Sequence, residues 1–159
     1  MLTTRQVVLL LRVLLVTAFV AVLVLQFLSV PGTLDYRAEV NPDLEWRRWV
    51  LLGVLELELV GAQVVIVCTW MLLGMVQQDR IFSDDALRWV DGMIAALGVG
   101  WLAWAALSLA IVLDADDPGM PLMLAIMLLA GAVFILILLV MRALLRKATT
   151  LHTDLEGVI

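Results

Sequence analysis

The sequence predicts an all-α integral membrane protein, a four-helix bundle with both termini cytoplasmic. Three observations lead to this prediction. First, 64% of the 159 residues are hydrophobic, whereas a soluble domain of this length is nearer half apolar. Second, the apolar residues occur in four long blocks with short polar connectors between them. Third, the Lys and Arg residues are unevenly distributed between the two sides that these blocks define.

Each block is long enough to cross a membrane, because about 20 helical residues span the ~30 Å hydrocarbon core. The predicted spans cover about residues 7–30, 49–73, 88–113 and 120–142, and a helical cytoplasmic tail follows at 143–159. The first block is too long for the apolar core of a signal peptide and lacks a good cleavage sequence, so we expect it to remain as a span. The connectors are short, so a single membrane domain is expected.

The orientation follows from the basic residues, which favour the cytoplasmic side. With the N-terminus inside, the inner side holds seven of the ten: Arg5, Arg12, Arg80, Arg88, Arg142, Arg146 and Lys147. The outer side holds Arg37, Arg47 and Arg48. The sequence therefore favours both termini on the inner side, although Arg47 and Arg48 weaken the contrast.

Composition also excludes several classes of function. One cysteine and one histidine are too few for a disulfide framework or for a multi-histidine metal site. The net charge of −5 argues against direct nucleic-acid binding. We expect no catalytic residues, no metal and no cofactor, because phosphate loops and nucleophile sets do not occur. The methionine stripe Met120, Met123 and Met127 is ordinary packing material rather than a copper site.

Polar residues inside the predicted spans are the candidates for a ligand or proton site. They are Gln26, Glu56, Glu58, Gln63 and Ser108. At 1.5 Å per residue from Trp49, Glu56 lies about 10 Å and Glu58 about 13 Å below the outer edge, so a polar cluster is expected in the outer half of the membrane.

The two glutamates do not share a face, since two residues turn a helix by about 200°. We expect Glu56 to face the Gln26 and Ser108 side, and Glu58 to face another helix or a second subunit. Intramembrane carboxyl groups are costly and usually face inward. Four interpretations stay open: a proton, cation or ligand site; interhelical hydrogen bonds; a water-filled vestibule without function; or a second helix that begins only at Leu59.

A stripe of small residues marks the third span. Gly92, Ala96 and Gly100 recur every four residues, and Trp104 and Ser108 continue the same stripe. Small residues at this spacing let two helices approach closely in lipid. The stripe predicts a packing seam, either within the bundle or between two copies of the chain.

The connector before the third span has the pattern of a helix start. Ser83 is a good N-cap, and Asp84 and Asp85 place negative charge in the first helical turn. The spacing predicts that Arg88 pairs with Asp84 and Asp91. On the first span, Arg12 is expected to extend its side chain to the lipid headgroups.

Two stretches resemble a known family. Phe82, Ser83, Leu87 and Arg88 in "RIFSDDALRWVDGM", and Leu155, Glu156, Val158 and Ile159 in the acidic amphipathic end, resemble domain-of-unknown-function family 2975, an uncharacterised family of small bacterial membrane proteins. The resemblance implies four spans, a bacterial cytoplasmic membrane and no assigned reaction. It also hints at signalling, since some members are encoded beside a small helix-turn-helix regulator. Glu56 and Glu58 are not part of the resemblance.

Three functions follow, from different classes. We expect a non-enzymatic protein that acts through protein contacts, as a regulator or accessory subunit of a membrane complex. Its partners would be the lipid bilayer, further copies of the chain or other membrane proteins, and a cytoplasmic protein at the tail. The alternative is a small oligomeric transporter or ion conduit that uses Glu56 or Glu58. An enzyme acting on lipid is the third, weakened because no nucleophile accompanies the carboxylates.

Overall fold

The computed structural model describes residues 4–29, 45–78, 80–113 and 117–156, and these residues form long helices. The first helix, α1 (Thr4–Val24), continues into a short π-helix, η1 (Leu25–Ser29). It is followed by α3 (Glu45–Gln77), α4 (Asp84–Leu113) and α5 (Gly119–Glu156). Four helices of the described chain are long and apolar enough to cross a membrane. The predicted fold class, an all-α membrane protein with four spans, is confirmed.

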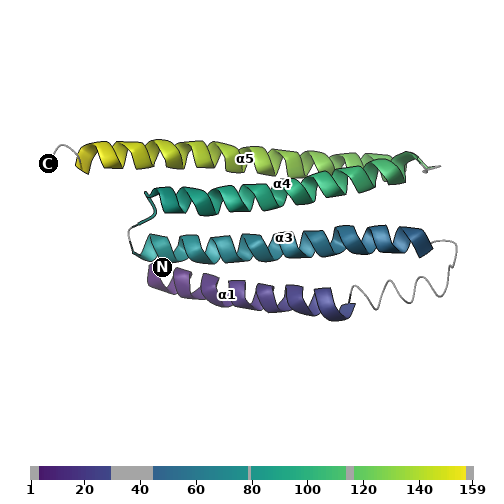
Figure 1. Ribbon diagram of the computed structural model, residues 1–159, viewed down its shortest axis with the longest axis horizontal. Helices are drawn as coiled ribbons and strands as arrows, with labels where there is room; N and C mark the ends of the chain where they lie inside the picture. The colour runs from purple at the N-terminus through teal and green to yellow at the C-terminus, as the bar shows by residue number, and fades with distance from the viewer. Residues whose placement is uncertain (1–3, 30–44, 79, 114–116, 157–159) are drawn as a thin grey trace.

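The helices lie side by side in a row that follows their order in the chain (Figure 1). α1 packs against α3, α3 against α4, and α4 against α5. Successive helices run in opposite directions, so the N-terminus and the C-terminus lie at the same end of the molecule (Figure 1). We call this the terminal end. It also holds the turn between α3 and α4.

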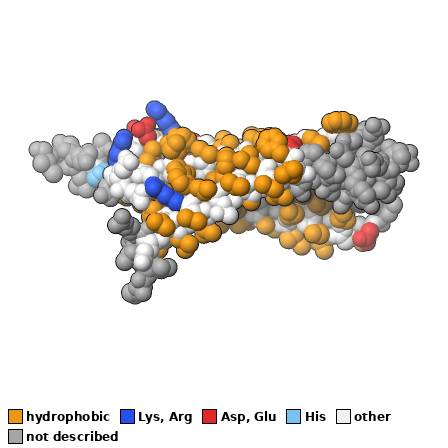
Figure 2. Space-filling view, turned by 90° about the horizontal axis from the view of Figure 1, so that it is seen from below, with side chains coloured by type: hydrophobic (Ala, Val, Ile, Leu, Met, Phe, Trp, Pro, Cys, Tyr) orange, Lys and Arg blue, Asp and Glu red, His pale blue; other side chains and the backbone are white. Residues whose placement is uncertain are grey.

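Most large apolar side chains face outward, as the row arrangement requires. The buried apolar residues are few: Val8, Cys68, Ala86, Leu107 and Leu124. Figure 2 shows hydrophobic side chains over the middle of one face, with Lys and Arg gathered towards the terminal end. An apolar exterior of this kind is stable in lipid and not in water. The Lys and Arg side chains on this face therefore gather where the helices leave the membrane.

Small residues set the close packing of α3 against α4. A Cβ atom on Gly92 would lie 3.6 Å from the sulfur of Cys68, and one on Gly61 would lie 3.8 Å from the carbonyl oxygen of Ala96. Gly100 in turn faces Glu58. The three contacts follow one another in opposite directions along α3 and α4, as expected for antiparallel helices. They show that the two helices pack closely over the middle of both spans.

The contact between α4 and α5 depends on a tryptophan and an ion pair. Trp101 Nε1 donates a hydrogen bond to the carbonyl oxygen of Leu128 over 2.9 Å, and the indole lies against Gly131. Nearer the terminal end, Arg142 of α5 binds both carboxylate oxygens of Asp91 of α4. Two groups that would be costly in lipid therefore neutralise each other at this interface.

Candidate functional site

Glu58 lies in the interface between α3 and α4. Its carboxylate is packed against the backbone of Gly100, so that a Cβ atom at this position would be 2.9 Å from Oε2 and 3.1 Å from Oε1. The glycine provides the space that the carboxylate occupies. Oε1 is buried and has no hydrogen-bond partner among the described residues. A buried carboxylate oxygen without a partner is costly in lipid, so Glu58 is the strongest candidate for a group that binds a proton or a cation.

Two further polar atoms on α4 are buried without a partner in the described part of the chain. They are Nε1 of Trp104 and Oγ of Ser108, one and two helical turns beyond Gly100. Ser108 is only 2% exposed. Glu58 and Trp104 are each nine residues, about 13 Å, from Trp49 and Leu113, where their spans end. These three unpartnered atoms therefore lie in the half of the membrane away from the terminal end.

Gln26 and Gln63 meet on the other side of α3. Gln63 Nε2 donates a hydrogen bond to Gln26 Oε1 over 2.7 Å and ties η1 to α3. Glu56 lies on the same face of α3 as Gln63, because seven residues turn a helix by almost two full turns. π-Helical turns often occur at functional sites, and Gln26 is placed by such a turn.

The five predicted candidates are therefore divided between two interfaces. Glu58 faces another helix, α4, at Gly100. Gln26 and Gln63 lie where η1 meets α3, and Glu56 shares that face. Ser108 belongs to α4, two helices away from Gln26 in the row (Figure 1). Trp104 joins Glu58 as a site residue through its unpaired N–H donor, a feature that its place in the small-residue stripe did not reveal.

The small-residue seam lies within a single chain in this structure. Gly92 contacts Cys68, the Ala96 carbonyl contacts Gly61, and Gly100 contacts Glu58, all on α3. The face of α4 that carries the stripe is therefore covered by α3. A second copy of the chain would have to use a different surface.

The charges at the terminal end form interhelical and local pairs. Ser83 Oγ accepts a hydrogen bond from the Ala86 backbone N–H, so the predicted N-cap of α4 is confirmed. Arg88 pairs with Asp85 at 3.6 Å, and Arg80 lies 4.0 Å from the same carboxylate. The predicted pairing of Arg88 with Asp91 is wrong, because Asp91 is bound by Arg142. Spacing along one helix gave no information about an arginine on the neighbouring helix.

Arg12 has neutral partners at the interface of α1 and α3. Its Nη2 donates a hydrogen bond to Gln77 Oε1 over 2.6 Å, and its guanidinium carbon lies 5.3 Å from the centre of the Trp70 ring. Nε is buried and has no partner among the described residues. The expectation that Arg12 extends its side chain to the headgroups did not include these two contacts on α3.

The tail is part of α5 and contacts the turn between α3 and α4. The rings of Phe82 and His152 lie 5.8 Å apart at an interplanar angle of 59°. Thr149, on the same side of α5 as His152, is 7% exposed. Leu144 and Leu151 face away and are 56% and 65% exposed. The predicted ending at Leu155 to Ile159 falls on residues whose side chains lie outside the described part.

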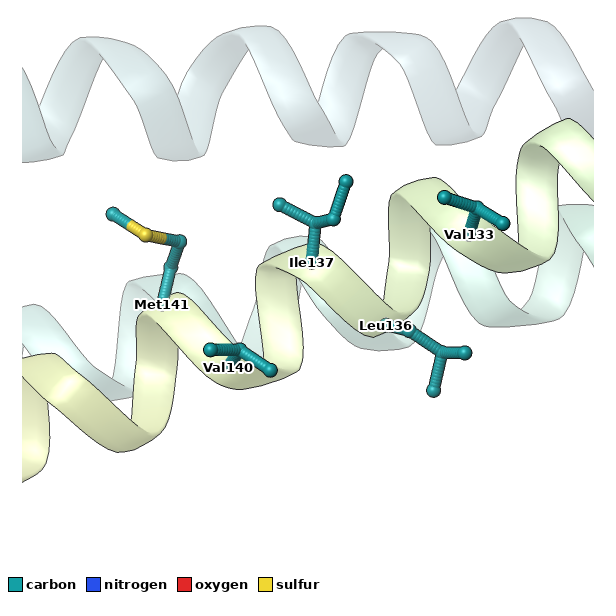
Figure 3. Close-up of a pocket in the computed structure, with 5 residues that line it drawn as sticks. All are labelled: Val133, Leu136, Ile137, Val140 and Met141. Atoms are coloured by element: carbon teal, nitrogen blue, oxygen red, sulfur yellow. The ribbon is translucent and has the colours of Figure 1, made fainter.

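A shallow groove on α5 contains no polar group. Figure 3 shows the residues that line it: Val133, Leu136, Ile137, Val140 and Met141. A lining of this kind suits the hydrocarbon chains of lipids and offers no polar or ionisable side chain. Among the described residues, no three His, Cys, Asp or Glu side chains lie close enough together to hold a metal ion.

Comparison with known proteins gives one match. The family model described as "Protein of unknown function (DUF2975)" matches residues 32–159, which is most of the chain and includes α3, α4 and α5. The match leaves out α1 and with it Arg12 and Gln26. No curated protein and no solved structure matches the chain.

Proposed function

This protein belongs to the DUF2975 family of proteins of unknown function, and we propose that it acts through protein contacts as a regulator or accessory subunit of a complex in the bacterial cytoplasmic membrane. The proposal assigns it no reaction. The observation that carries it is the length of α5 together with the apolar face that this helix presents beyond the membrane.

α5 is much longer than a membrane span requires. Its 38 residues measure about 57 Å, whereas about 20 residues cross the ~30 Å core. The remainder projects at the terminal end, past α3 and α4 (Figure 1). The excess of basic residues at this end supports a cytoplasmic position for it. α5 continues without a break to Glu156, which argues against a tail that lies flat on the membrane surface.

The projecting part of α5 has two different faces. Thr149 and His152 face the turn between α3 and α4, and Phe82 holds this side in place. Leu144, Lys147 and Leu151 share the opposite face, because they are three, four and seven residues apart. We call these three residues the tail face. Exposed leucines beside a lysine on a rigid helix suit a partner with an apolar, acidic groove.

The experiment compares two exposed neighbours on the tail. Leu151→Glu places a charge on the tail face, and Thr150→Glu places the same charge about 100° away. Both full-length variants and the wild type are isolated from native membranes in mild detergent. We expect the partner to be lost with Leu151→Glu and retained with Thr150→Glu. Partner sets that are identical for all three proteins would refute the proposal.

A second candidate function is supported by the unpaired carboxylate oxygen of Glu58. A small transporter or ion conduit needs a titratable group within the membrane, and Glu58 is one. Because the described helices form a row in which each packs against its neighbours in the chain, several copies would have to form the pathway. Flux through proteoliposomes should fall with Glu58→Gln and persist with Glu56→Gln. No flux with the wild type, or equal flux with both variants, removes this function.

A further inference from the structure

Arg12 carries a charge that no acidic side chain balances in the described part of the structure. Its hydrogen-bond acceptor is the amide of Gln77, and its other contact is the ring of Trp70. Arg142, the other arginine that joins two spans, contrasts with it. Arg142 is held by both oxygens of Asp91. The fold thus neutralises one of these cations and leaves the other with neutral partners.

The guanidinium group of Arg12 lies at the depth of the lipid headgroups. Gln77 is the last residue of α3, so the guanidinium reaches the end of that span. Trp70 lies seven residues, about 10 Å, deeper along the same helix. Trp70 is 36% exposed, and tryptophan favours the boundary between hydrocarbon and headgroups. An anion that approaches Arg12 from the membrane would therefore be a headgroup.

The guanidinium has donors to spare. It carries five N–H groups, and Gln77 accepts from one nitrogen, Nη2. Nε is enclosed without a partner, and the hydrogen bond that Arg12 makes within the described residues comes from Nη2, so Nη1 is not engaged by it. The side-chain amide of Gln77 receives the bond through its oxygen, which leaves its own N–H groups available to an acceptor. Donors from two helices therefore converge beside an exposed indole.

We propose that Arg12, together with Gln77 and Trp70, binds the phosphodiester group of a phospholipid headgroup where α1 meets α3. A phosphodiester carries the missing negative charge, and its oxygens accept charge-assisted hydrogen bonds from arginine. Trp70 provides an apolar and cation-binding surface beside the lipid chain and the guanidinium. This site is independent of the tail face, and it does not depend on the proposed protein contacts.

The test is a lipid titration of the full-length protein in mild non-ionic detergent, read by native mass spectrometry. Phosphatidylglycerol is the probe, and diacylglycerol, which has no phosphate, is the reference. Loss of a charge-assisted bond should weaken phosphatidylglycerol binding by on the order of tenfold in Arg12→Gln. Arg12→Lys keeps the charge without the planar fork, so an intermediate loss is expected.

Arg146→Gln is the matched control, since it removes an exposed charge at the same end of the molecule. It should bind phosphatidylglycerol like the wild type. Inorganic phosphate is added in a second arm. Displacement of the lipid by millimolar phosphate would show that the site binds a phosphoryl group. In that case the ligand would be a soluble phosphate compound and not a lipid headgroup. Equal lipid binding by wild type and an Arg12→Gln protein with unchanged helicity and elution volume would overturn the proposal.

Discussion

Gly131 shows how a single residue determines the distance between two spans. A Cβ atom there would lie 2.8 Å from Cδ1 and 3.2 Å from Nε1 of Trp101. The indole cannot simply move away, because its N–H group binds the Leu128 carbonyl on the same helix as Gly131. The close approach of α4 and α5 therefore depends on the missing side chain at this position.

We predict that Gly131→Ala destabilises the folded protein by about 1–3 kcal/mol, the usual cost of an overpacked contact. Gly98→Ala is the control, because a Cβ atom there has nothing within 4 Å. Alanine also favours a helix over glycine by about 0.5–1 kcal/mol, so the control should be neutral or slightly stabilised. Thermal unfolding in detergent measures both. Equal melting temperatures would contradict the contact described for Trp101.

Some residue-scale features could be predicted from the sequence, and others depend on the neighbouring helix. The N-cap at Ser83 follows from local chemistry, and the structure shows it. The partner of Asp91 could not be predicted from the local sequence, because Arg142 lies 51 residues away in the chain. Similarly, helical geometry separated Glu56 from Glu58, but only the packing of α3 on α4 shows which carboxylate meets Gly100.

At the scale of helices, the Asp91–Arg142 pair links α4 to α5 near the terminal end. It is bidentate and joins two elements, whereas Asp85 and Arg88 are three residues apart on one helix. Bidentate geometry makes a pair more specific, and exposed pairs within one helix contribute little.

A double-mutant cycle separates these two pairs. Asp91→Asn and Arg142→Gln, singly and together, should show a clear coupling in thermal unfolding. Asp85→Asn with Arg88→Gln is the matched cycle and should show almost none, because Arg88 is 82% exposed. A coupling at Asp85–Arg88 as large as that at Asp91–Arg142 would mean that the interhelical bond does not hold α5.

Helix boundaries illustrate what composition can and cannot predict about elements. The apolar blocks locate the spans, yet α3 continues to Gln77 and α4 begins at Asp84, beyond the apolar parts. A helix can continue into polar residues where its end is capped or held by a neighbouring helix. In α4, Ser83 caps the first turn, and Arg142 of α5 binds Asp91 in the third turn. The continuity of α5 to Glu156 agrees with a helical tail, since no Gly or Pro interrupts residues 132–156.

At the scale of the whole molecule, the row of helices determines what one chain can do. Each of α3 and α4 has a neighbour on both sides, whereas α1 and α5 form the edges (Figure 1). The sequence predicted four spans, but the order of packing depends on contacts such as Gly100 with Glu58 and Trp101 with Leu128. The row therefore rests on contacts between successive helices, which the sequence alone does not specify.

The central claim is that the projecting end of α5 contacts a protein partner. Photo-cross-linking in intact native membranes tests it most directly, with a photoreactive residue at Leu151 and, as control, at Leu122 near the opposite end of α5, which is similarly exposed at 64%. We expect an adduct of defined mass to one protein from position 151 and none to that protein from position 122. The same adducts from both positions, or none from position 151, would contradict it.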